Sequence, residues 1–353
     1  MPELAGIEEY LPVKLTKDPM LVDGAGLLEF YKTEKARLGD VYELIAKKNP
    51  GFNDHGEKHV NAVLIKTARL LKHDGNLENN YFNAAEFFIL CLATIYHDTG
   101  MVFVDRDADQ DRDGHQLRVR DVLSELGPRK RPQEETDCFI YVIEGHTGIL
   151  RDGSRDVIPT LEDPGYCHDN CIRIRELAAV LRLADEISEG HHRIIPFQID
   201  ANLIDTKNEF HHISCEGVKN QPNPGRQQIN VTHDVNIDRI FNWASRTDKT
   251  REQALSEYLD FLYKKTSKIN ANRLYTKYFT SVLEPYKKLF AVFRFWKGGR
   301  ELDIQINPVI YDDKKLVGED DIPLYSIAPN YEPATLVPKL LEKYDGDEYK
   351  PPF

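Results

Sequence analysis

The chain has 353 residues, of which 41% are hydrophobic and 29% charged, and its formal net charge is −12 at pH 7. These values are typical of a soluble globular protein with a full core, and the negative charge argues against a long footprint on duplex nucleic acid. The first residues lack a basic segment followed by an apolar one, and no run approaches the ~20 apolar residues of a membrane span. We therefore expect a cytoplasmic protein without a membrane partner, whose five cysteines stay reduced because their number is odd and their spacing is not repeated.

Proline and glycine residues mark the expected divisions of the chain. Pro2, Pro12, Pro19 and Gly24 interrupt the beginning, which we expect to be irregular. A helix is predicted from about residue 32 to residue 48, where an Asn-Pro-Gly sequence closes it. The expected regions are an N-terminal arm (1–34), a helical core (35–200), an α+β lobe (201–311) and an extended tail (312–353).

The segment after residue 50 predicts an amphipathic helix with a histidine near its start. Side chains recur at helical spacing in one stripe, formed by Val60, Val63, Leu64, Thr67 and Leu71. His59 flanks this stripe. His55 lies four residues earlier, but Gly56 stands where the zinc-protease motif needs Glu, which excludes that class. For His55, the sequence leaves open both a turn or capping role beside Asp54 and a role in supporting a metal ligand.

An apolar run from Asn83 to Gly100 predicts a central buried helix that ends in the adjacent pair His97 and Asp98. Neighbouring side chains leave a helix about 100° apart, so both residues can reach one metal ion. The second carboxylate oxygen of Asp98 then stays free to bridge to another ion. Alternatively, the pair is a polar helix end, but a buried aspartate is costly without a cation or hydrogen bonds.

Two further histidines are delivered by predicted helices. His115 lies at the start of the predicted helix HQLRVRDVLSEL, and His146 ends the apolar run CFIYVIEGH. A second His-Asp pair, His168 and Asp169, is flanked by Cys167 and Cys171. Two cysteines and one histidine are too few for a structural zinc site unless distant residues help, so we interpret this pair either as a chance match to the His-Asp pattern or as a helix N-cap.

The helix IRIRELAAVLRLADEIS carries a carboxylate on its apolar stripe. Ile174, Ala178 and Leu181 lie eleven, seven and four residues before Asp185. A buried aspartate in such a position asks for a charged partner. A salt bridge to Arg182 or Arg193 is one explanation, and a metal shared with the other predicted ligands is the other.

The order of these residues resembles that of the HD superfamily of metal-dependent phosphohydrolases. Its pattern is one histidine, an adjacent His-Asp pair and a distant aspartate on helices of an α-helical core. The matching residues here are His59, His97, Asp98 and Asp185. The phrases NDHGEKHV, HDTGM and LRLADEIS look most like the HD-CE type, and the resemblance covers about residues 50 to 195. His115 and His146 stand in the order that binuclear members use for a second metal.

The resemblance implies a mainly α fold and hydrolysis of a phosphate ester or anhydride of a nucleotide. The substrate is expected to be a deoxynucleoside triphosphate or a cyclic or signalling nucleotide. Imidazoles and carboxylates suit one or two divalent transition metal ions, manganese, iron, nickel or zinc, with magnesium less natural. Such ions activate water and polarise a phosphoryl oxygen. Asp98, His115 and His146 are the expected catalytic residues, and Arg182, Arg193 and His55 the expected substrate contacts.

Two departures from the pattern keep a second reading open. Met101 stands where many relatives have lysine, and Thr147 follows His146 where several binuclear relatives have a second histidine. The alternative is a regulatory module that binds metal and nucleotide without turnover and signals to a partner protein. The neighbouring His191 and His192 are candidates to compensate for the missing groups.

The C-terminal part predicts a smaller α+β lobe. Strand-like alternation is expected in three stretches, IIPFQID, FHHISCEGV and QQINVTHDV. Helices are predicted at about 236–247, 250–268 and 271–290, followed by a β-hairpin with a Gly298-Gly299 turn. The tail is expected to be extended, with one short helix near Val337 to Tyr344. We expect this lobe to form a wall of the active site, a contact between copies of the chain or a docking face for a protein partner.

Overall fold

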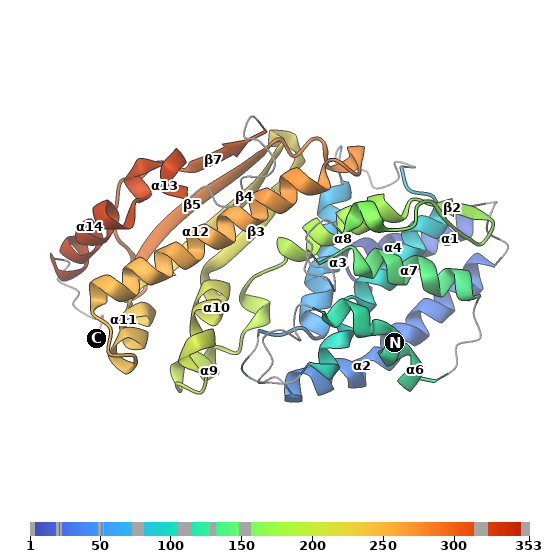
Figure 1. The fold of residues 1–353 in the computed structure, drawn as a ribbon, viewed down its shortest axis with the longest axis horizontal. Coiled ribbons are helices and arrows are strands. Elements are labelled where there is room, and N and C mark those ends of the chain that lie inside the picture. Colours follow the sequence, from blue (N-terminus) through green and yellow to red (C-terminus); the bar gives the residue numbers. More distant parts are fainter. Residues whose placement is uncertain are drawn as a thin grey trace. The chain divides into compact units, whose positions relative to one another are not determined.

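The computed structural model describes residues 4–18, 21, 23–48, 51, 53–72, 81–104, 114–127, 132–147, 157–313 and 324–346. The chain divides into two compact units. The first contains Met1–Ser188 and Tyr275–Pro285, and the second contains Glu189–Leu274 and Tyr286–Phe353. The expectation of a mainly α protein with a helical core and a smaller α+β C-terminal lobe is confirmed (Figure 1).

The N-terminal region is helical, and the prediction of an irregular arm is wrong for the described residues. It forms η1 (Gly6–Tyr10), α1 (Leu11–Lys17) and the start of α2 (Gly24–Lys48). Ile7, Leu11 and Leu15 are almost fully buried, because η1 packs on α3 and α1 packs on α2 and α4. Pro12 does not interrupt this arrangement, since proline is tolerated in the first turn of a helix.

Helix α4 (Ala84–Tyr96) is the centre of the first unit. It contacts α1, α2, α3 (Glu57–Leu71), α7 (Gln133–Glu144) and α8 (Ile174–Glu186) (Figure 1). All of its residues are buried, in agreement with its apolar composition on every side. The stretch Ala84–Phe103 is long and apolar enough to cross a membrane, but 94% of it is buried inside the structure, as in the core helix of a helical bundle.

Shorter elements connect these helices. In chain order they are η2 (Thr99–Phe103), η3 (His115–Arg118), α6 (Val119–Glu125), η4 (Ile158–Thr160), β1 (Gly165–Cys167), β2 (Asn170–Ile172) and η7 (Ser281–Leu283). Strands β1 and β2 form an antiparallel hairpin whose two-residue turn, His168 and Asp169, has positive φ at both positions. The hairpin contacts α7 and α4.

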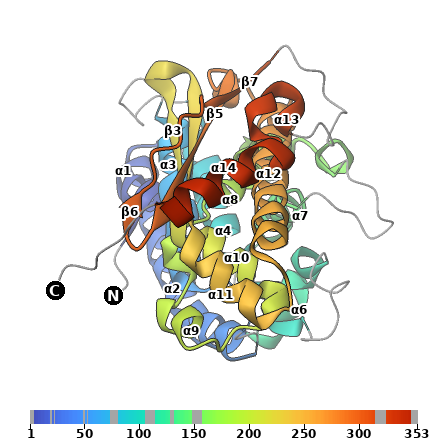
Figure 2. The same cartoon turned by 90° about the vertical axis from the view of Figure 1, so that its left-hand side faces the viewer.

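The second unit contains a mixed sheet. Its strands are β3 (Val218–Asn223), β4 (Gln228–Asn236), β5 (Lys288–Lys297), β6 (Arg300–Glu301) and β7 (Val309–Asp312). The order is β3-β4-β5-β6, with β7 also on β5, and β4 and β5 are parallel while the other pairs are antiparallel. Helix α12 (Arg251–Thr276) runs along one face of the sheet (Figures 1 and 2). The two predicted hairpins, around Pro224 and at Gly298-Gly299, are both present.

Several predicted elements of this unit are different in the structure. Residues 194–217 are not strands: η5 (His191–Arg193) precedes them, and they contain α9 (Pro196–Asp200) and α10 (Thr206–Gly217). The Asp205 side chain caps α10 by accepting a hydrogen bond from the backbone N–H of Lys207. The helix predicted at 250–268 extends to Thr276 as α12, in which the buried Arg273 bonds to Asn270. The second predicted helix, 271–290, is wrong beyond Thr276, because η7 follows and β5 begins at Lys288.

The remaining elements are η6 (Pro224–Arg226), α11 (Ile237–Arg246), α13 (Leu324–Ile327), η8 (Pro329–Tyr331) and α14 (Pro333–Gly346). The predicted short helix near 337–344 therefore exists but is longer, and Pro338 lies inside it. The parts of the predicted tail at 314–323 and 347–353 lie outside the described residues.

The boundaries of the two compact units differ from those of the four predicted regions. The first unit includes the predicted arm and ends at Ser188 instead of residue 200. It also contains a later segment of the chain, Tyr275–Pro285. Tyr81 explains this return, because its hydroxyl lies 2.9 Å from Ser281 Oγ and donates to Glu176 on α8.

Candidate metal centre

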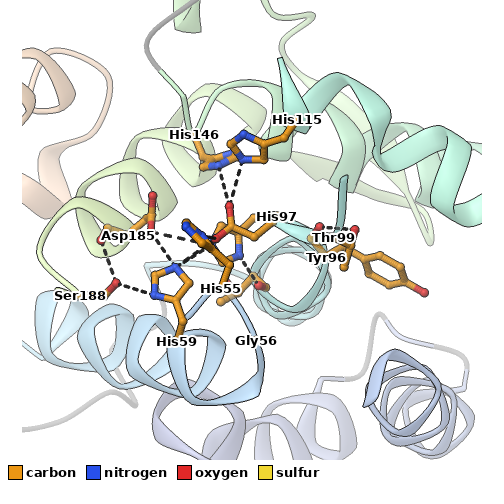
Figure 3. Close-up of polar contacts among 12 residues, drawn as sticks. His55, Gly56, His59, Tyr96, His97, Thr99, His115, His146, Asp185 and Ser188 are labelled. Carbon is orange, nitrogen blue, oxygen red and sulfur yellow. Dashed lines mark hydrogen bonds and ion pairs between the residues drawn. The ribbon is translucent and has the colours of Figure 1, made fainter. Parts of the chain in front are cut away.

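Five helical elements of the first unit bring a histidine or an aspartate to one place. His59 lies in the first turn of α3, His97 caps the end of α4 and Asp98 follows it. His115 begins η3, His146 follows α7, and Asp185 lies in the last turn of α8. All six predicted metal ligands therefore belong to one cluster (Figure 3).

Three of the imidazole rings are held by their Nδ1 atoms. Nδ1 of His97 lies 2.7 Å from the Thr94 carbonyl oxygen, and Nδ1 of His146 lies 2.5 Å from that of Ile143. A carbonyl oxygen only accepts, so both Nδ1 atoms carry hydrogen. When these rings are neutral, each Nε2 atom therefore presents a lone pair to the cluster.

His59 is held in the same way by a serine. Its Nδ1 lies 3.3 Å from Oγ of Ser188, whose hydroxyl already donates to the Asp185 carbonyl oxygen at 2.8 Å. Ser188 therefore accepts from Nδ1 of His59, and Nε2 is left facing the cluster. Ser188 was not predicted as part of the cluster, although its place three residues after Asp185 at the same helix end is a usable signal.

Asp98 lies between two pairs of histidines. Its Oδ2 atom is 3.3 Å from Nε2 of His59 and 3.3 Å from Nε2 of His97. Its Oδ1 atom is 3.0 Å from Nε2 of His115 and 3.8 Å from Nε2 of His146. Figure 3 shows His115 and His146 together on one side and His59 on the other. Oδ2 thus faces His59 and His97, with His55 beside it at 2.7 Å, and Oδ1 faces His115 and His146, which is the arrangement of a bridging ligand.

Asp185 completes the first pair. Its Oδ1 atom lies 3.1 Å from Nε2 of His59 and 3.8 Å from Nε2 of His97. The Asp185 side chain is 27% exposed, whereas His59 and His97 are fully buried. The cluster is therefore closed on the side of α4 and partly open at Asp185.

Charge balance explains the electrostatics of the cluster. Burial opposes ionisation of Asp98 and Asp185, but the surrounding histidines outweigh it and hold the pKa of both carboxyls well below the usual range. Burial likewise lowers the pKa of His97, yet Asp98 and Asp185 together raise it to about 10. Burial, with the nearby His97 and His115, lowers the pKa of His146 to about 3. The carboxylates are thus anionic and attract positive charge.

The donor set fits a divalent metal ion. Nε2 of His59 and Nε2 of His97 lie 3.3 Å apart, and two lone pairs that face each other at this distance repel unless a cation or a proton lies between them. Imidazole and carboxylate ligands with Nδ1 atoms fixed by hydrogen bonds are the usual surroundings of a protein-bound transition metal. Three overlapping groups bring their ligand atoms within 4.8 Å of one another: His59, His97 and Asp185; Asp98, His115 and His146; and His55, His59 and Asp98.

A glycine allows η3 to approach the residues after Asp98. A Cβ atom on Gly100 would lie 1.9 Å from the carbonyl oxygen of His115. This contact is far shorter than van der Waals distance, so only glycine lets His115 come close enough to reach Asp98.

The three predicted substrate contacts have different surroundings. His55 is buried and its Nδ1 atom lies 2.7 Å from Oδ2 of Asp98. Arg182 donates to the carbonyl oxygen of Thr147 at 3.3 Å, and its guanidinium lies over the ring of Tyr275. Arg193 belongs to the C-terminal unit, where it is buried. Substrate contacts for all three stay predictions.

The fold and the cluster define a helical domain of the HD type with a histidine–aspartate cluster that could hold a divalent metal ion. The profile of the HD-CE family matches residues 50–268, so the chain belongs to the HD-CE family. No curated protein and no solved structure matches the chain.

Proposed function

We propose that this protein is a metal-dependent phosphohydrolase that cleaves a phosphate ester or anhydride of a nucleotide. The observation that carries the proposal is the position of Asp98, whose two oxygens face His59 and His97 on one side and His115 and His146 on the other. A carboxylate placed in this way can hold two cations side by side, which is the arrangement that in-line displacement at phosphorus uses.

The residues divide into two sets. His59, His97, Asp98 and Asp185 would hold one divalent ion, and Asp98, His115 and His146 would hold a second. Manganese, iron, nickel and zinc suit this donor set, and magnesium suits it less well. A bound ion supplies Lewis-acid polarisation of a phosphoryl oxygen and a lowered pKa of water.

His146 and His115 differ in their suitability for proton transfer. His146 is 4% exposed, and its Nδ1 hydrogen is committed to the Ile143 carbonyl oxygen, so its Nε2 atom is suited to be a ligand. The His115 side chain is 12% exposed and begins a short 3-10 helix. We therefore assign to His115 the proton transfer to the leaving oxygen, when it does not hold an ion.

Arg182 is suited to contact phosphate. It lies three residues before Asp185 on α8 and bonds to the carbonyl oxygen of Thr147, next to His146. Its guanidinium stacks on Tyr275, which fixes the plane of the donors. A polyanionic substrate needs such local cations because the chain as a whole carries a net charge of −12. A deoxynucleoside triphosphate and a cyclic or signalling nucleotide are the substrate classes that we propose.

The test is chromatography that resolves the products formed from a panel of nucleotides with the purified protein and Mn²⁺. We expect triphosphate or phosphate from a nucleoside triphosphate, or a linear product from a cyclic nucleotide. Asp98→Ala should abolish both turnover and metal binding. Asp121→Ala, at an exposed aspartate on α6, is the matched control and should leave turnover unchanged. Retained turnover in Asp98→Ala would refute the site.

One observation favours a second candidate, the regulatory module without turnover. Met101 is fully buried in an apolar cluster with Ile45 and Val122, so this chain places no cation at that position. Metal binding without hydrolysis of any nucleotide in the panel would favour this candidate. In that case the C-terminal unit is the proposed docking face for a protein partner or a second copy of the chain.

A further inference from the structure

A second group of metal-binding side chains lies outside the histidine–aspartate cluster. Glu135 lies in the first turn of α7, Cys167 is the last residue of β1, and His168 is the first residue of the β1–β2 turn. The ligand atoms of these three residues all lie within 4.8 Å of one another. None of the three belongs to the proposed catalytic centre.

The contacts within this group are specific. Nε2 of His168 lies 2.9 Å from Oε2 of Glu135, and the ring of His168 stands edge-on to Phe88 of α4, which orients it. The hairpin turn has φ of 52° at His168 and 59° at Asp169, so both residues adopt the left-handed backbone conformation that tight two-residue hairpin turns require. This turn places the side chain of His168 beside that of Cys167 and against α7.

Glu135 is buried, so its carboxylate charge must be compensated by neighbouring groups. Its side chain is fully buried, whereas that of His168 is 18% exposed. A buried carboxylate is costly unless hydrogen bonds or a positive charge compensate it, and a metal ion is one source of that charge. The thiol of Cys167 would not strengthen an ion pair between His168 and Glu135. In a metal site, however, its thiolate would be a strong ligand.

We propose that Glu135, Cys167 and His168 form a second metal site, which takes zinc or a similar ion such as cobalt. One carboxylate oxygen, one thiolate and one imidazole are three ligands that zinc accepts, and solvent can fill a fourth position from the partly exposed side of His168. Two nitrogen or oxygen ligands of a tetrahedral ion stand about 3.3 Å apart, so His168 and Glu135 need to separate by only a few tenths of an ångström.

The site has a structural consequence. It ties the β1–β2 hairpin to α7, the helix that precedes His146, and the hairpin leads directly into α8, which carries Asp185. A bound ion therefore stabilises the segment between two helices of the catalytic centre, and the proposal holds whether or not that centre turns over.

Cobalt titration tests the site separately from the histidine–aspartate cluster. A cobalt–thiolate bond absorbs in the near ultraviolet, and the described cluster around Asp98 contains no sulfur ligand. We expect this absorption in the wild-type protein and in Asp98→Asn, and its loss in Cys167→Ala. Cys171→Ala is the matched control, because Cys171 is exposed on the neighbouring strand and should not contribute. Absence of the absorption in the wild type, or its survival in Cys167→Ala, would overturn the proposal, as would its loss in Cys171→Ala.

A second variant, His168→Asn, tests the same site if Cys167→Ala does not fold. His168→Asn removes the imidazole and keeps the turn, because asparagine adopts positive φ readily. In the Asp98→Asn background, Zn²⁺ at a hundredfold excess over its Kd should raise Tm by about 4 °C. The same addition should leave Tm unchanged once His168→Asn is present. An equal rise in both proteins would show that the ion binds elsewhere.

Discussion

Nδ1 of His55 lies 2.7 Å from Oδ2 of Asp98, although His55 precedes helix α3 and Asp98 follows helix α4. The same Oδ2 atom faces His59 and His97. His55 therefore orients the carboxylate that joins the two halves of the cluster, in addition to any contact with a substrate.

Replacing His55 should weaken metal binding without abolishing it. Residues that orient a ligand through a hydrogen bond typically contribute about 10- to 100-fold in metal affinity. We expect His55→Ala to raise the Kd for Mn²⁺ by about that factor, as measured by isothermal titration calorimetry. Asp121→Ala is the control, because Asp121 is exposed on α6 and belongs to none of the groups that could hold a metal among the described residues. An unchanged Kd in His55→Ala would show that Asp98 is oriented without it.

The ligands of the cluster could be predicted from the sequence because helix patterns and the resemblance to the HD superfamily indicated the same residues, and His115 and His146 were included through the resemblance. His97 and Asp98 end an apolar run, and Asp185 lies on an apolar stripe, so spacing alone places them on buried helix surfaces. The sequence left open that His55 supports a metal ligand, but it could not identify Asp98 as the partner, since that contact depends on a loop that precedes helix α3. The pairing of His168 with Glu135 was missed for a similar reason, because the two residues are 33 positions apart and share no periodic pattern.

Gly100 should be essential for the position of His115. A Cβ atom there would lie 1.9 Å from the His115 carbonyl oxygen, so η2 and η3 must move apart in Gly100→Ala. The overpacking should cost about 1–3 kcal/mol of unfolding free energy. Because His115 moves away from Asp98, Gly100→Ala should weaken binding of the ion at Asp98, His115 and His146 more than binding of the ion at His59, His97 and Asp185. Calorimetric titration of Mn²⁺ measures both steps.

Gly39 provides the matched control for this substitution. It is an exposed residue within α2, and a Cβ atom there meets nothing within 4 Å. Gly39→Ala should therefore stabilise the protein by about 0.5–1 kcal/mol through helix propensity and leave metal binding unchanged. Equal metal binding in Gly100→Ala and Gly39→Ala would contradict the role that we assign to Gly100.

The fold was predicted less completely than the site, and the errors have physical causes. Short stretches such as residues 196–200 alternate in a way that fits a strand, yet their context makes them helical. The N-terminal prolines indicated an irregular arm, but buried Ile7 and Leu11 hold that segment against the helices. Such tertiary packing is not visible in local sequence patterns.

Lys35 should contribute strongly to the stability of the first unit. Its Nζ atom lies 2.7 Å from Oε2 of Glu8, and the two side chains are 2% and 0% exposed. Removing one partner of a buried ion pair leaves an uncompensated charge, so Lys35→Met should lower the unfolding free energy by about 3–5 kcal/mol. Urea denaturation followed by circular dichroism measures the change.

Two further variants separate charge from packing at this pair. Adding Glu8→Gln to Lys35→Met removes the uncompensated charge and should restore part of the lost stability. Lys47→Met tests an exposed pair on the same helix, in which Lys47 and Glu43 are 71% and 69% exposed. It should change the unfolding free energy by less than about 0.5 kcal/mol. A similar loss for Lys47→Met and Lys35→Met would contradict the importance of burial.

His233 is buried in the C-terminal unit as a neutral ring. Its Nε2 atom lies 3.0 Å from Oγ1 of Thr266, whose hydroxyl donates to the Leu262 carbonyl oxygen, so Nε2 carries the hydrogen. Its buried Nδ1 atom has no hydrogen-bond partner among the described residues. Burial, aided by the charge of Lys265 and opposed by Glu189 and Asp234, lowers its pKa to about 3. A proton on Nδ1 would add a charge with no acceptor.

This depressed pKa predicts that the protein loses stability as the pH falls. In the unfolded chain His233 takes up a proton near its ordinary pKa of 6.5, while the folded chain resists until about 3. The unfolded state therefore binds more protons in this window, and the contribution is full above pH 6.5 and falls below it. Between pH 7 and pH 5 the loss from this residue should be about 2 kcal/mol. His233→Gln keeps a donor for Thr266 but cannot titrate, so its unfolding free energy should fall by that much less over the same range. Urea denaturation of both proteins at pH 7 and pH 5 measures the difference, and parallel losses would show that His233 is not the titrating group.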